Sequence, residues 1–328
     1  MTEALVGLDA IRAAADRLRG IAIRTPLVPF AAGPPRVLLK AESLQPIGAF
    51  KIRGAYNAIA QLSPEERRRG VVTHSSGNHA QGVARAARLL GTHAVVVMPS
   101  DAPAVKRARV EADGAEIVTV AVESGAREAM ADRLVTERGL VLVPPYDDDR
   151  IIAGQGTVGL EIAEEVEDLE LVLVPVGGGG LASGVAAAVK ALRPGARVVG
   201  VEPELAADAA ESLREGRIVR WDGALTARTI ADGTRTQAIG RRPFAHLRRL
   251  LDGIVTVTEA EIAAGVRLAA EESRLVVEPS GALTVAAARF RGAELGLAGQ
   301  AGAIVAVVSG GNVDPGRYRE LLASPVPA

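Results

Sequence analysis

Lys51 is the residue of this chain with the clearest potential for covalent chemistry. The four lysines are Lys40, Lys51, Lys106 and Lys190. Only Lys51 follows a glycine-containing loop into the first turn of a predicted helix. There, the positive end of the helix dipole and burial among Phe50 and Ile52 would lower the pKa of its amine. A lysine with a lowered pKa can serve as a nucleophile or a general base, so we expect such chemistry here; the alternative is a solvated surface lysine.

Gly177–Gly180 form a run of four glycines between the predicted strand ELVLVPV and a predicted helix. Backbone N–H groups of such a run can converge at a helix N-terminus, which is typical of a phosphate-binding loop. A dinucleotide site is a second interpretation, because Glu202 ends the next strand where a ribose-binding acid would lie. The glycine spacing does not match G-x-G-x-x-G, however, and a tight turn without a ligand is a third interpretation.

The segment Thr73–Gly82, which contains Ser75-Ser76-Gly77-Asn78-His79, links a short predicted strand to a helix. Its two hydroxyls, its amide and the helix N-terminus suit a carboxylate and a ring oxygen as ligands. Ser76 or Asn78 acting as a simple helix cap is the alternative. For His79 we favour a structural role over that of a general base.

The predicted elements indicate a doubly wound α/β architecture. The expected strands are residues 36–41, 71–73, 94–98, 116–120, 171–176, 197–201, 254–257 and 303–308. The expected helices are residues 49–61, 78–90, 104–112, 124–138, 154–165, 181–192, 259–274 and 281–289. The strands are continuous apolar runs, as in parallel strands covered on both faces, and ligands of such sheets bind at the carboxyl ends of the strands. Ser309–Asn312 form a polar glycine turn at such an end, or simply an ordinary turn.

Composition excludes several classes of function. The formal net charge of −1 gives no electrostatic support for a nucleic-acid partner, and the absence of cysteine excludes disulfides and thiolate metal sites. No apolar run approaches the roughly 20 residues of a membrane span. We therefore expect a cytoplasmic protein without membrane or nucleic-acid partners.

The lysine loop, the serine-containing loop, the glycine run and the last polar turn together resemble those of the fold-type II pyridoxal-phosphate enzymes (tryptophan synthase β-like). They are most similar to the threonine/serine dehydratase and serine racemase branch of that family. The resemblance rests on Ser43–Ala55, Thr73–Gly82, Gly177–Gly180 and Ser309–Asn312, and extends through Ala153–Ile162, Thr229–Gly233, Val257–Ile262 and Val277–Ala282. It implies two doubly wound parallel-sheet domains. Residues 1–70 and 148–328 would form a large domain that binds pyridoxal phosphate (PLP), and residues 71–147 a small inserted domain that closes over the substrate.

The resemblance also implies roles for individual residues. Lys51 would hold PLP covalently and move the Cα proton, and Ser76 would be a second acid/base on the opposite face. The implied cofactor-binding residues are Phe50, Lys51, Asn78, Gly177, Gly178, Gly179, Gly180 and Ser309. The implied substrate-binding residues are Ser75, Ser76, Gly77, Asn78, His79 and Thr236. In the racemase branch, the positions of Glu202, the Ala206 carbonyl and Asp208 bind Mg²⁺, Mn²⁺ or Ca²⁺.

The implied activity is an ammonia-lyase reaction that converts L-serine or L-threonine to a 2-oxo acid and ammonia, with serine racemisation as a second activity, in a homodimer. A 3-hydroxyaspartate dehydratase is the alternative within the family. Arg235 could read the second carboxylate of that substrate if it points inward, and would not if it points outward. Alternatives of other classes are an NAD-binding oxidoreductase, which rests on the glycine loop and Glu202, and a catalytically silent PLP-binding protein.

Overall fold

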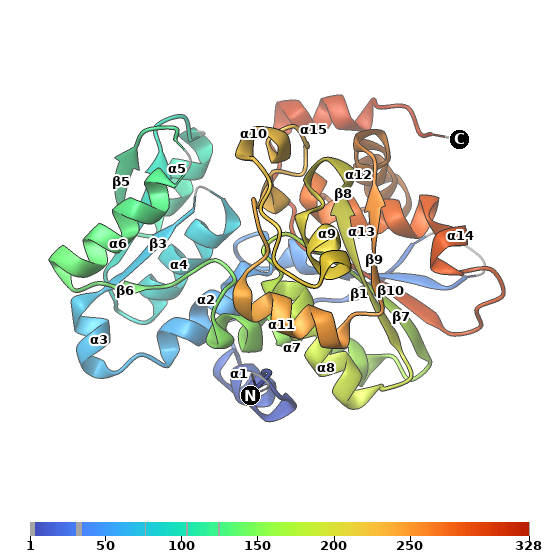
Figure 1. The fold of residues 1–328 in the computed structure, drawn as a ribbon, viewed down its shortest axis with the longest axis horizontal. Coiled ribbons are helices and arrows are strands. Elements are labelled where there is room, and N and C mark those ends of the chain that lie inside the picture. Colours follow the sequence, from blue (N-terminus) through green and yellow to red (C-terminus); the bar gives the residue numbers. More distant parts are fainter. Residues whose placement is uncertain (1–3, 31–34, 76, 103, 124, 328) are drawn as a thin grey trace.

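The computed structural model describes residues 4–30, 35–75, 77–102, 104–123 and 125–327, with Val105 described by its backbone alone. Its strands form two separate sheets (Figure 1). The larger sheet has the order β1-β2-β10-β7-β8-β9 and the smaller one the order β5-β4-β3-β6. The strands are β1 Leu27–Phe30, β2 Val37–Ala41, β3 Val71–His74, β4 Ala94–Pro99, β5 Glu116–Val120, β6 Val141–Leu142, β7 Leu169–Pro175, β8 Arg197–Pro203, β9 Gly253–Val257 and β10 Ala303–Val308.

Helices occupy most of the chain between the strands. The α-helices are α1 Leu8–Arg17, α2 Lys51–Ala60, α3 Pro64–Arg69, α4 Asn78–Leu89, α5 Ala104–Ala112, α6 Ala126–Arg138, α7 Asp149–Glu165, α8 Gly180–Leu192, α9 Asp208–Glu215, α10 Gly223–Thr226, α11 Arg241–Leu250, α12 Glu259–Ser273, α13 Pro279–Phe290, α14 Gly292–Leu295 and α15 Pro315–Leu322. Short 3₁₀ turns lie at η1 Glu42–Leu44, η2 Glu204–Ala206 and η3 Asp232–Thr234. Among the described residues, no helix has both the length and the apolar composition that crossing a bilayer requires.

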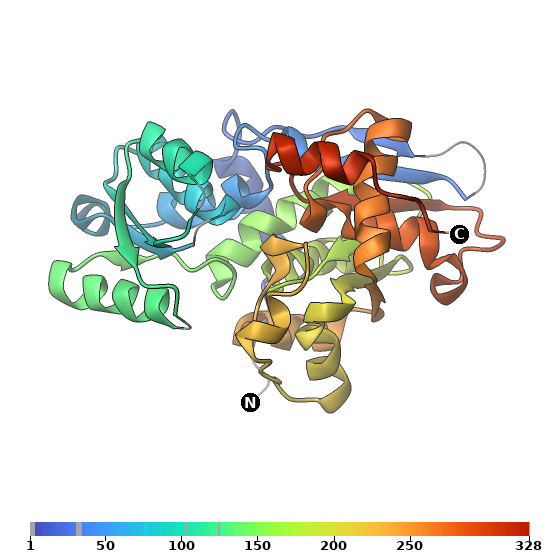
Figure 2. The same cartoon turned by 90° about the horizontal axis from the view of Figure 1, so that it is seen from above.

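The larger sheet is buried on both faces (Figures 1 and 2). Along β7, Leu171 and Leu173 pack into the core formed with α12 and α13, whereas Val172 and Val174 pack into the core formed with α7 and α8. Successive side chains of a strand point to opposite faces, so a strand between two helical layers must be apolar throughout. The α/β prediction from continuous apolar runs is confirmed.

All the strands that the sequence predicted pair in parallel, and one further strand, which was not predicted, lies at an edge of the larger sheet. There, β1 pairs antiparallel with β2, with Leu27 opposite Lys40. The sequence did not mark β1 as a strand, because it is four residues long, contains Pro29 and is only partly buried. Proline lacks the backbone donor for a central strand but is tolerated at an edge, which explains the missed element.

The smaller sheet is built from residues 71–142, inside the segment expected to form the inserted domain. Its core, however, extends to α2, whose Ile52 and Ile59 pack with Val71 and Val96. The helix that begins with Lys51 therefore contributes to the core of the smaller unit. Whether residues 71–147 move as one body to close over a substrate stays a prediction.

Helix starts were the least well predicted boundaries. The structure begins α7 at Asp149, five residues before the expected position. The Asp148 side chain caps this helix by accepting a hydrogen bond from the Arg150 backbone N–H. The segment Pro144–Arg150, expected only as a crossing between domains, thus carries a helix N-cap.

Candidate active site

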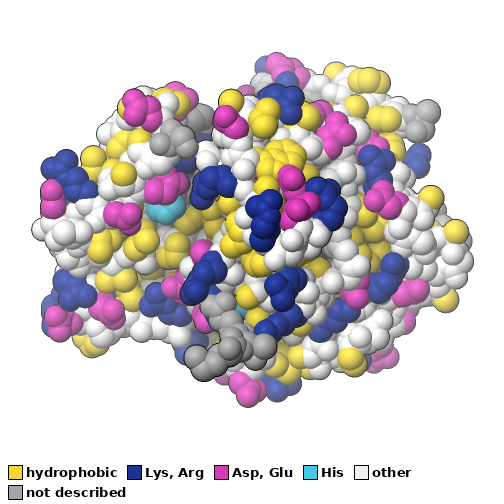
Figure 3. All heavy atoms as spheres, in the orientation of Figure 1, with side chains coloured by type: hydrophobic (Ala, Val, Ile, Leu, Met, Phe, Trp, Pro, Cys, Tyr) yellow, Lys and Arg dark blue, Asp and Glu magenta, His cyan; other side chains and the backbone are white. Residues whose placement is uncertain are grey.

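A cavity of about 860 Å³ lies between the two sheets and collects the predicted loops. The described cofactor and substrate residues that line it are Phe50, Lys51, Ser75, Gly77, Asn78, His79, Gly177, Gly178, Gly179, Gly180, Thr236 and Ser309. On the face drawn in Figure 3, Lys and Arg side chains are interspersed with Asp and Glu side chains, in keeping with the net charge of −1. Ser76 lies outside the described residues, and the structure says nothing of it. The predicted metal ligands Glu202, Ala206 and Asp208 do not line this cavity.

Lys51 is the first residue of α2, and its side chain opens onto the cavity. Its Nζ donates a hydrogen bond to the Pro145 carbonyl oxygen at 2.7 Å and lies 5.1 Å from the centroid of the Phe50 ring. Burial lowers the pKa of Lys51 to about 8, because desolvation penalises the charged amine. The direction of this shift is the one that the sequence predicted, and burial was one of its two predicted causes.

The glycine loop joins the end of β7 to α8, whose N-cap Gly179 has a φ of +89°. Residues other than glycine rarely adopt such a φ. A Cβ at Gly178 would overlap the ring of Tyr146, so the loop must present bare backbone on that side. The arrangement places backbone N–H groups at a helix N-terminus, as a phosphate-binding loop requires.

Tyr146 is a cavity residue that the sequence analysis missed. It lies in the segment expected only as a domain crossing, and the adjacent Pro145 carbonyl accepts the hydrogen bond from Lys51. Burial raises the pKa of Tyr146 to about 12, so its hydroxyl stays protonated at neutral pH. The sequence clue was an aromatic residue in a chain with only 2% aromatics.

The loop after β3 places several polar groups at the start of α4. The Gly77 backbone N–H donates to Ser75 Oγ at 3.3 Å, and Asn78 is the first residue of the helix. His79 is buried, and its Nε2 lies 3.0 Å from the Val143 carbonyl oxygen, so Nε2 carries the hydrogen. Burial lowers the pKa of His79 to about 3. A neutral, carbonyl-bound imidazole fits the structural role favoured for His79, and leaves backbone N–H groups of the helix start to meet a carboxylate.

Ser309 follows β10 at the carboxyl end of the larger sheet and is buried. Its carbonyl oxygen accepts a hydrogen bond from the Phe50 backbone N–H at 3.1 Å, and Ala49 forms an isolated bridge with Gly310. These contacts fix the start of α2 against the end of β10. The predicted partners of the cofactor ring, from opposite ends of the chain, therefore lie side by side.

Two nitrogens of the Arg235 guanidinium group are bound by the backbone of its own loop. Its Nε and Nη2 both donate to the Thr229 carbonyl oxygen, at 2.9 and 2.6 Å. The neighbouring Thr236 lines the cavity, and its Oγ1 donates to Asp208 Oδ1 at 3.3 Å. Arg235 thus braces its own loop through two of its nitrogens, and it is also one of the residues that line the cavity.

Glu202 and Asp208 form a pair of buried carboxylates beside that loop. Glu202 accepts hydrogen bonds from the backbone N–H groups of Ala209 and Ala210, at 3.1 and 2.7 Å. Asp208 Oδ2 has no hydrogen-bond partner among the described residues. Burial raises the pKa of Glu202 well above its usual range and that of Asp208 to about 7. Two buried carboxylates with an unpartnered oxygen suit a bound cation, although no group of three or more acidic or histidine side chains gathers in the described ranges.

The family model described as "Pyridoxal-phosphate dependent enzyme" matches residues 18–310. The chain belongs to this family. It is 44% identical to the L-threo-3-hydroxyaspartate ammonia-lyase of Saccharomyces cerevisiae over 88% of this chain and 86% of that protein. It is 40% identical to the serine racemase of Schizosaccharomyces pombe over 96% of this chain and 97% of that protein. The solved threonine deaminase of T.th. is 45% identical, with a TM-score of 0.86, covering 94% of this chain and 99% of that one.

Membership of this family confirms the predicted fold class and the predicted PLP-dependent enzyme class. The NAD-binding alternative is wrong, and the structure shows why its key residue is unsuitable. Glu202 is buried and does not line the cavity that contains the glycine loop, so it does not face a ligand bound there.

Proposed function

We propose that this family member is an ammonia-lyase that converts L-serine and L-threonine to a 2-oxo acid and ammonia, with serine racemisation as a second activity. The observation that carries the proposal is Lys51, a partly buried amine with a pKa of about 8 that opens onto the same cavity as the glycine loop, Asn78 and Ser309. Relatives named threonine ammonia-lyase and serine racemase support the same reaction class.

The residues around the cavity fit the cofactor of this family. The bare backbone of Gly177–Gly180 suits a phosphate, Asn78 a ring oxygen, and Phe50 the side of a ring. Ser309 would face the ring nitrogen with a hydroxyl, which need not keep that nitrogen protonated as a carboxylate would. When bound, PLP supplies a ring that withdraws electrons from the Cα of an attached amino acid. A weaker electron sink favours β-elimination over transamination.

The protein's own groups then handle the protons and the substrate carboxylate. Lys51 Nζ takes the Cα proton on one face, and the β-hydroxyl of the substrate leaves with a proton as water. Backbone N–H groups at the start of α4, together with Ser75, would hold the carboxylate. Hydrolysis of the released product gives pyruvate from serine or 2-oxobutyrate from threonine, with ammonia. For racemisation, Ser76 would supply the second acid/base on the opposite face.

A panel of β-hydroxy amino acids tests this proposal directly. Purified enzyme supplied with PLP is incubated with L-serine, L-threonine and L-threo-3-hydroxyaspartate, and both 2-oxo acid and D-amino acid are measured. We expect 2-oxo acid from serine and threonine, and an absorbance band near about 410–420 nm from cofactor held by Lys51. A protein that shows the band but turns over none of the three substrates would be a silent binder.

L-threo-3-hydroxyaspartate is the second candidate substrate, because two of the similar relatives are named as its ammonia-lyases. The contacts of Arg235 bear on this choice. Since its guanidinium is bonded to the Thr229 carbonyl oxygen, we expect Arg235→Ala to change kcat/KM for serine and for 3-hydroxyaspartate by the same factor, within about threefold. A loss of kcat/KM with 3-hydroxyaspartate alone would show that Arg235 binds the second carboxylate of that substrate.

A divalent cation is the second part of the proposal. Glu202, the Ala206 carbonyl and Asp208 would provide oxygen ligands for Mg²⁺, Mn²⁺ or Ca²⁺, and water would complete the shell. The support is the buried pair of carboxylates and the unpartnered Asp208 Oδ2. Thr236, which donates to Asp208, connects this position to the loop that lines the cavity.

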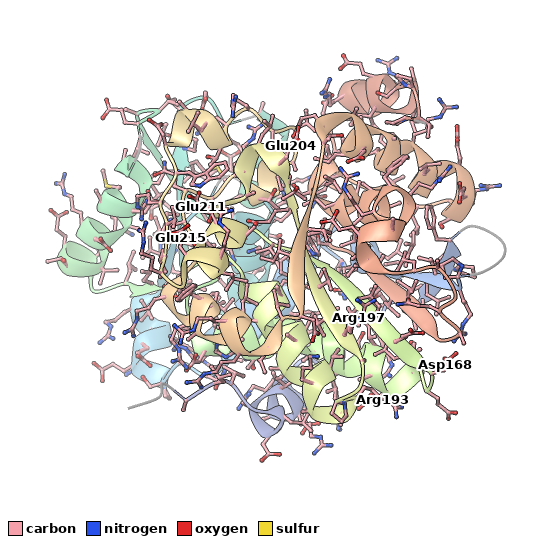
Figure 4. The ribbon with its side chains drawn as sticks, turned by 45° about the vertical axis from the view of Figure 1, so that its right-hand side comes forward. Asp168, Arg193, Arg197, Glu204, Glu211 and Glu215 are labelled. Atoms are coloured by element: carbon pink, nitrogen blue, oxygen red, sulfur yellow. The ribbon has the colours of Figure 1, made fainter. Side chains whose placement is uncertain are left out.

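Chelation is the test of the cation site. We expect EDTA to lower the Tm by about 5–10 °C and Mg²⁺ or Mn²⁺ to restore it, because the cation binds only the folded chain. Asp208→Ala should have a low Tm that neither EDTA nor Mg²⁺ changes. The matched control is Glu204→Ala just after the end of β8 (Figure 4), an exposed residue whose variant should respond to both as wild type does. An identical Tm with and without chelator in wild type would leave Glu202 and Asp208 without a cation.

The homodimer is also a proposal, and exposed apolar side chains support it. Ile23, Leu44 and Val276 are large hydrophobic residues that are 48%, 47% and 53% exposed. They lie on adjoining segments, since Ile23 hydrogen bonds with Gln45, and the Val276 carbonyl and Ser43 approach the same glycine, Gly311. Light scattering of wild type and Val276→Glu measures whether this patch is covered by a second copy.

A further inference from the structure

Asn78, the proposed partner of the cofactor's ring oxygen, is held by hydrogen bonds at both ends of its amide group. Its Oδ1 accepts from Asn312 Nδ2 at 2.8 Å, and its Nδ2 donates to Glu278 Oε1 at 2.6 Å. An amide nitrogen carries two hydrogens, so one N–H of Asn78 is left, and Asn78 lines the cavity. An amide that is fixed in this way has one N–H left to donate to a ligand.

The direction of these hydrogen bonds is set by neighbouring groups that are only donors or only acceptors. Arg109 Nη1 donates to Asn312 Oδ1 at 2.6 Å, and Asn312 Nδ2 donates to the Ile47 carbonyl oxygen as well as to Asn78. A guanidinium group can only donate and a backbone carbonyl oxygen can only accept, so Asn312 Oδ1 must face Arg109 and Asn312 Nδ2 must face the Ile47 carbonyl oxygen. The chain from Arg109 through Asn312 and Asn78 to Glu278 therefore excludes the flipped orientation of either amide.

Glu278 is the acceptor at the end of this chain and is 5% exposed. It is the N-cap residue of α13 and makes no cap hydrogen bond with its side chain, which instead lies against Gly310, next to Ser309. Its carboxyl group also accepts a hydrogen bond from the Asn312 backbone N–H, and burial raises its pKa to about 7. Burying a carboxyl group costs free energy of folding unless hydrogen bonds compensate for the lost water.

The geometry points to Glu278 as a positioning residue that orients the Asn78 amide so that its second N–H faces the ring oxygen of the cofactor. Glu278 acts through Asn78, and this role rests on the proposed function, because it needs PLP in the cavity. Losing the acceptor frees the Asn78 amide to rotate, which removes a donor from the ring oxygen and weakens cofactor binding.

Glu278→Gln is the test variant, because it keeps the size of the side chain. Glutamine has one acceptor and one donor, so in either orientation its NH₂ faces an N–H group, that of Asn78 or that of the Asn312 backbone. We expect PLP affinity to fall by about tenfold or more, since a charge-assisted hydrogen bond is lost, and the absorbance band of the bound cofactor to shift or weaken. Glu261→Gln is the control, because Glu261 is also a buried carboxylate, is ion-paired with Arg291 and does not line the cavity. It should lower the Tm without changing the band.

A double-variant cycle decides whether Glu278 works through Asn78. PLP affinity is measured for wild type, Glu278→Gln, Asn78→Ala and the double variant. If the inference holds, Glu278→Gln adds no further loss in the Asn78→Ala background. Equal losses in both backgrounds, or a lower Tm with unchanged PLP affinity and band, would overturn it. Failure of the proposed function is distinguishable, because wild type itself would then show no band with PLP.

Discussion

Lys51→Ala is expected to abolish turnover, by roughly 10³-fold or more in kcat, and to prevent covalent attachment of PLP. The structure gives the reason: Lys51 is the described lysine at the start of α2 whose amine opens onto the cavity beside the glycine loop and Phe50. Borohydride reduction followed by mass spectrometry should find the cofactor on Lys51 in wild type and nowhere in the variant.

The matched control for this variant is Lys190→Ala. Lys190 is ion-paired with Asp252 at the far end of α8, and it does not line the cavity. Its loss should leave both turnover and cofactor attachment intact. Lys51→Ala that retained a tenth of the wild-type activity would contradict the assignment, and a normal Tm would show that the loss is not one of folding.

The low pKa of Lys51 gives this prediction a pH dependence. For a pKa of about 8, roughly one amine in ten is neutral at pH 7, against about one in three thousand for an ordinary lysine. Only the neutral amine attacks an aldehyde. The rate at which PLP attaches to cofactor-free protein should therefore rise with pH and level off above about 8, and not near the usual 10.5. A rate still rising steeply above pH 9 would show that Lys51 is not desolvated.

Ser76→Ala is expected to remove D-serine formation by about 10²-fold or more while lowering L-serine elimination by less than about tenfold. Racemisation needs a proton donor on each face of the cofactor, whereas elimination from the L-enantiomer needs only Lys51. Chiral analysis of the serine pool and a 2-oxo acid assay, run on the same reaction, separate the two activities.

The control for Ser76→Ala is Ser100→Ala, because Ser100 is an exposed serine in the turn after β4 and does not line the cavity. It should leave both activities unchanged. Unchanged D-serine formation in Ser76→Ala would remove the residue from the mechanism, and a parallel loss of both activities would assign it to substrate binding instead.

The sequence by itself indicated eight of the ten strands that the structure describes, and the loops of the site. Apolar strands such as Leu169–Pro175 and Ala303–Val308 are readable because burial on both faces demands an unbroken apolar run. Glycine runs, a lysine at a helix start and polar turns after strands are local features, and parallel strands bring their carboxyl ends to one edge of a sheet. That is why residues from Phe50 to Ser309 could be assigned to one cavity before their contacts were known.

Only the tertiary structure decided what depends on partners distant in the sequence. The Pro145 carbonyl beside Lys51 and the ring of Tyr146 against Gly178 are contacts between separate segments. The pKa of Lys51 is lowered by burial, which depends on the packing of other elements around it. The orientation of Asn78 depends on Asn312, 234 positions away, and on Glu278, 200 positions away, and no local pattern records such hydrogen bonds because spacing along the chain does not fix distance in space.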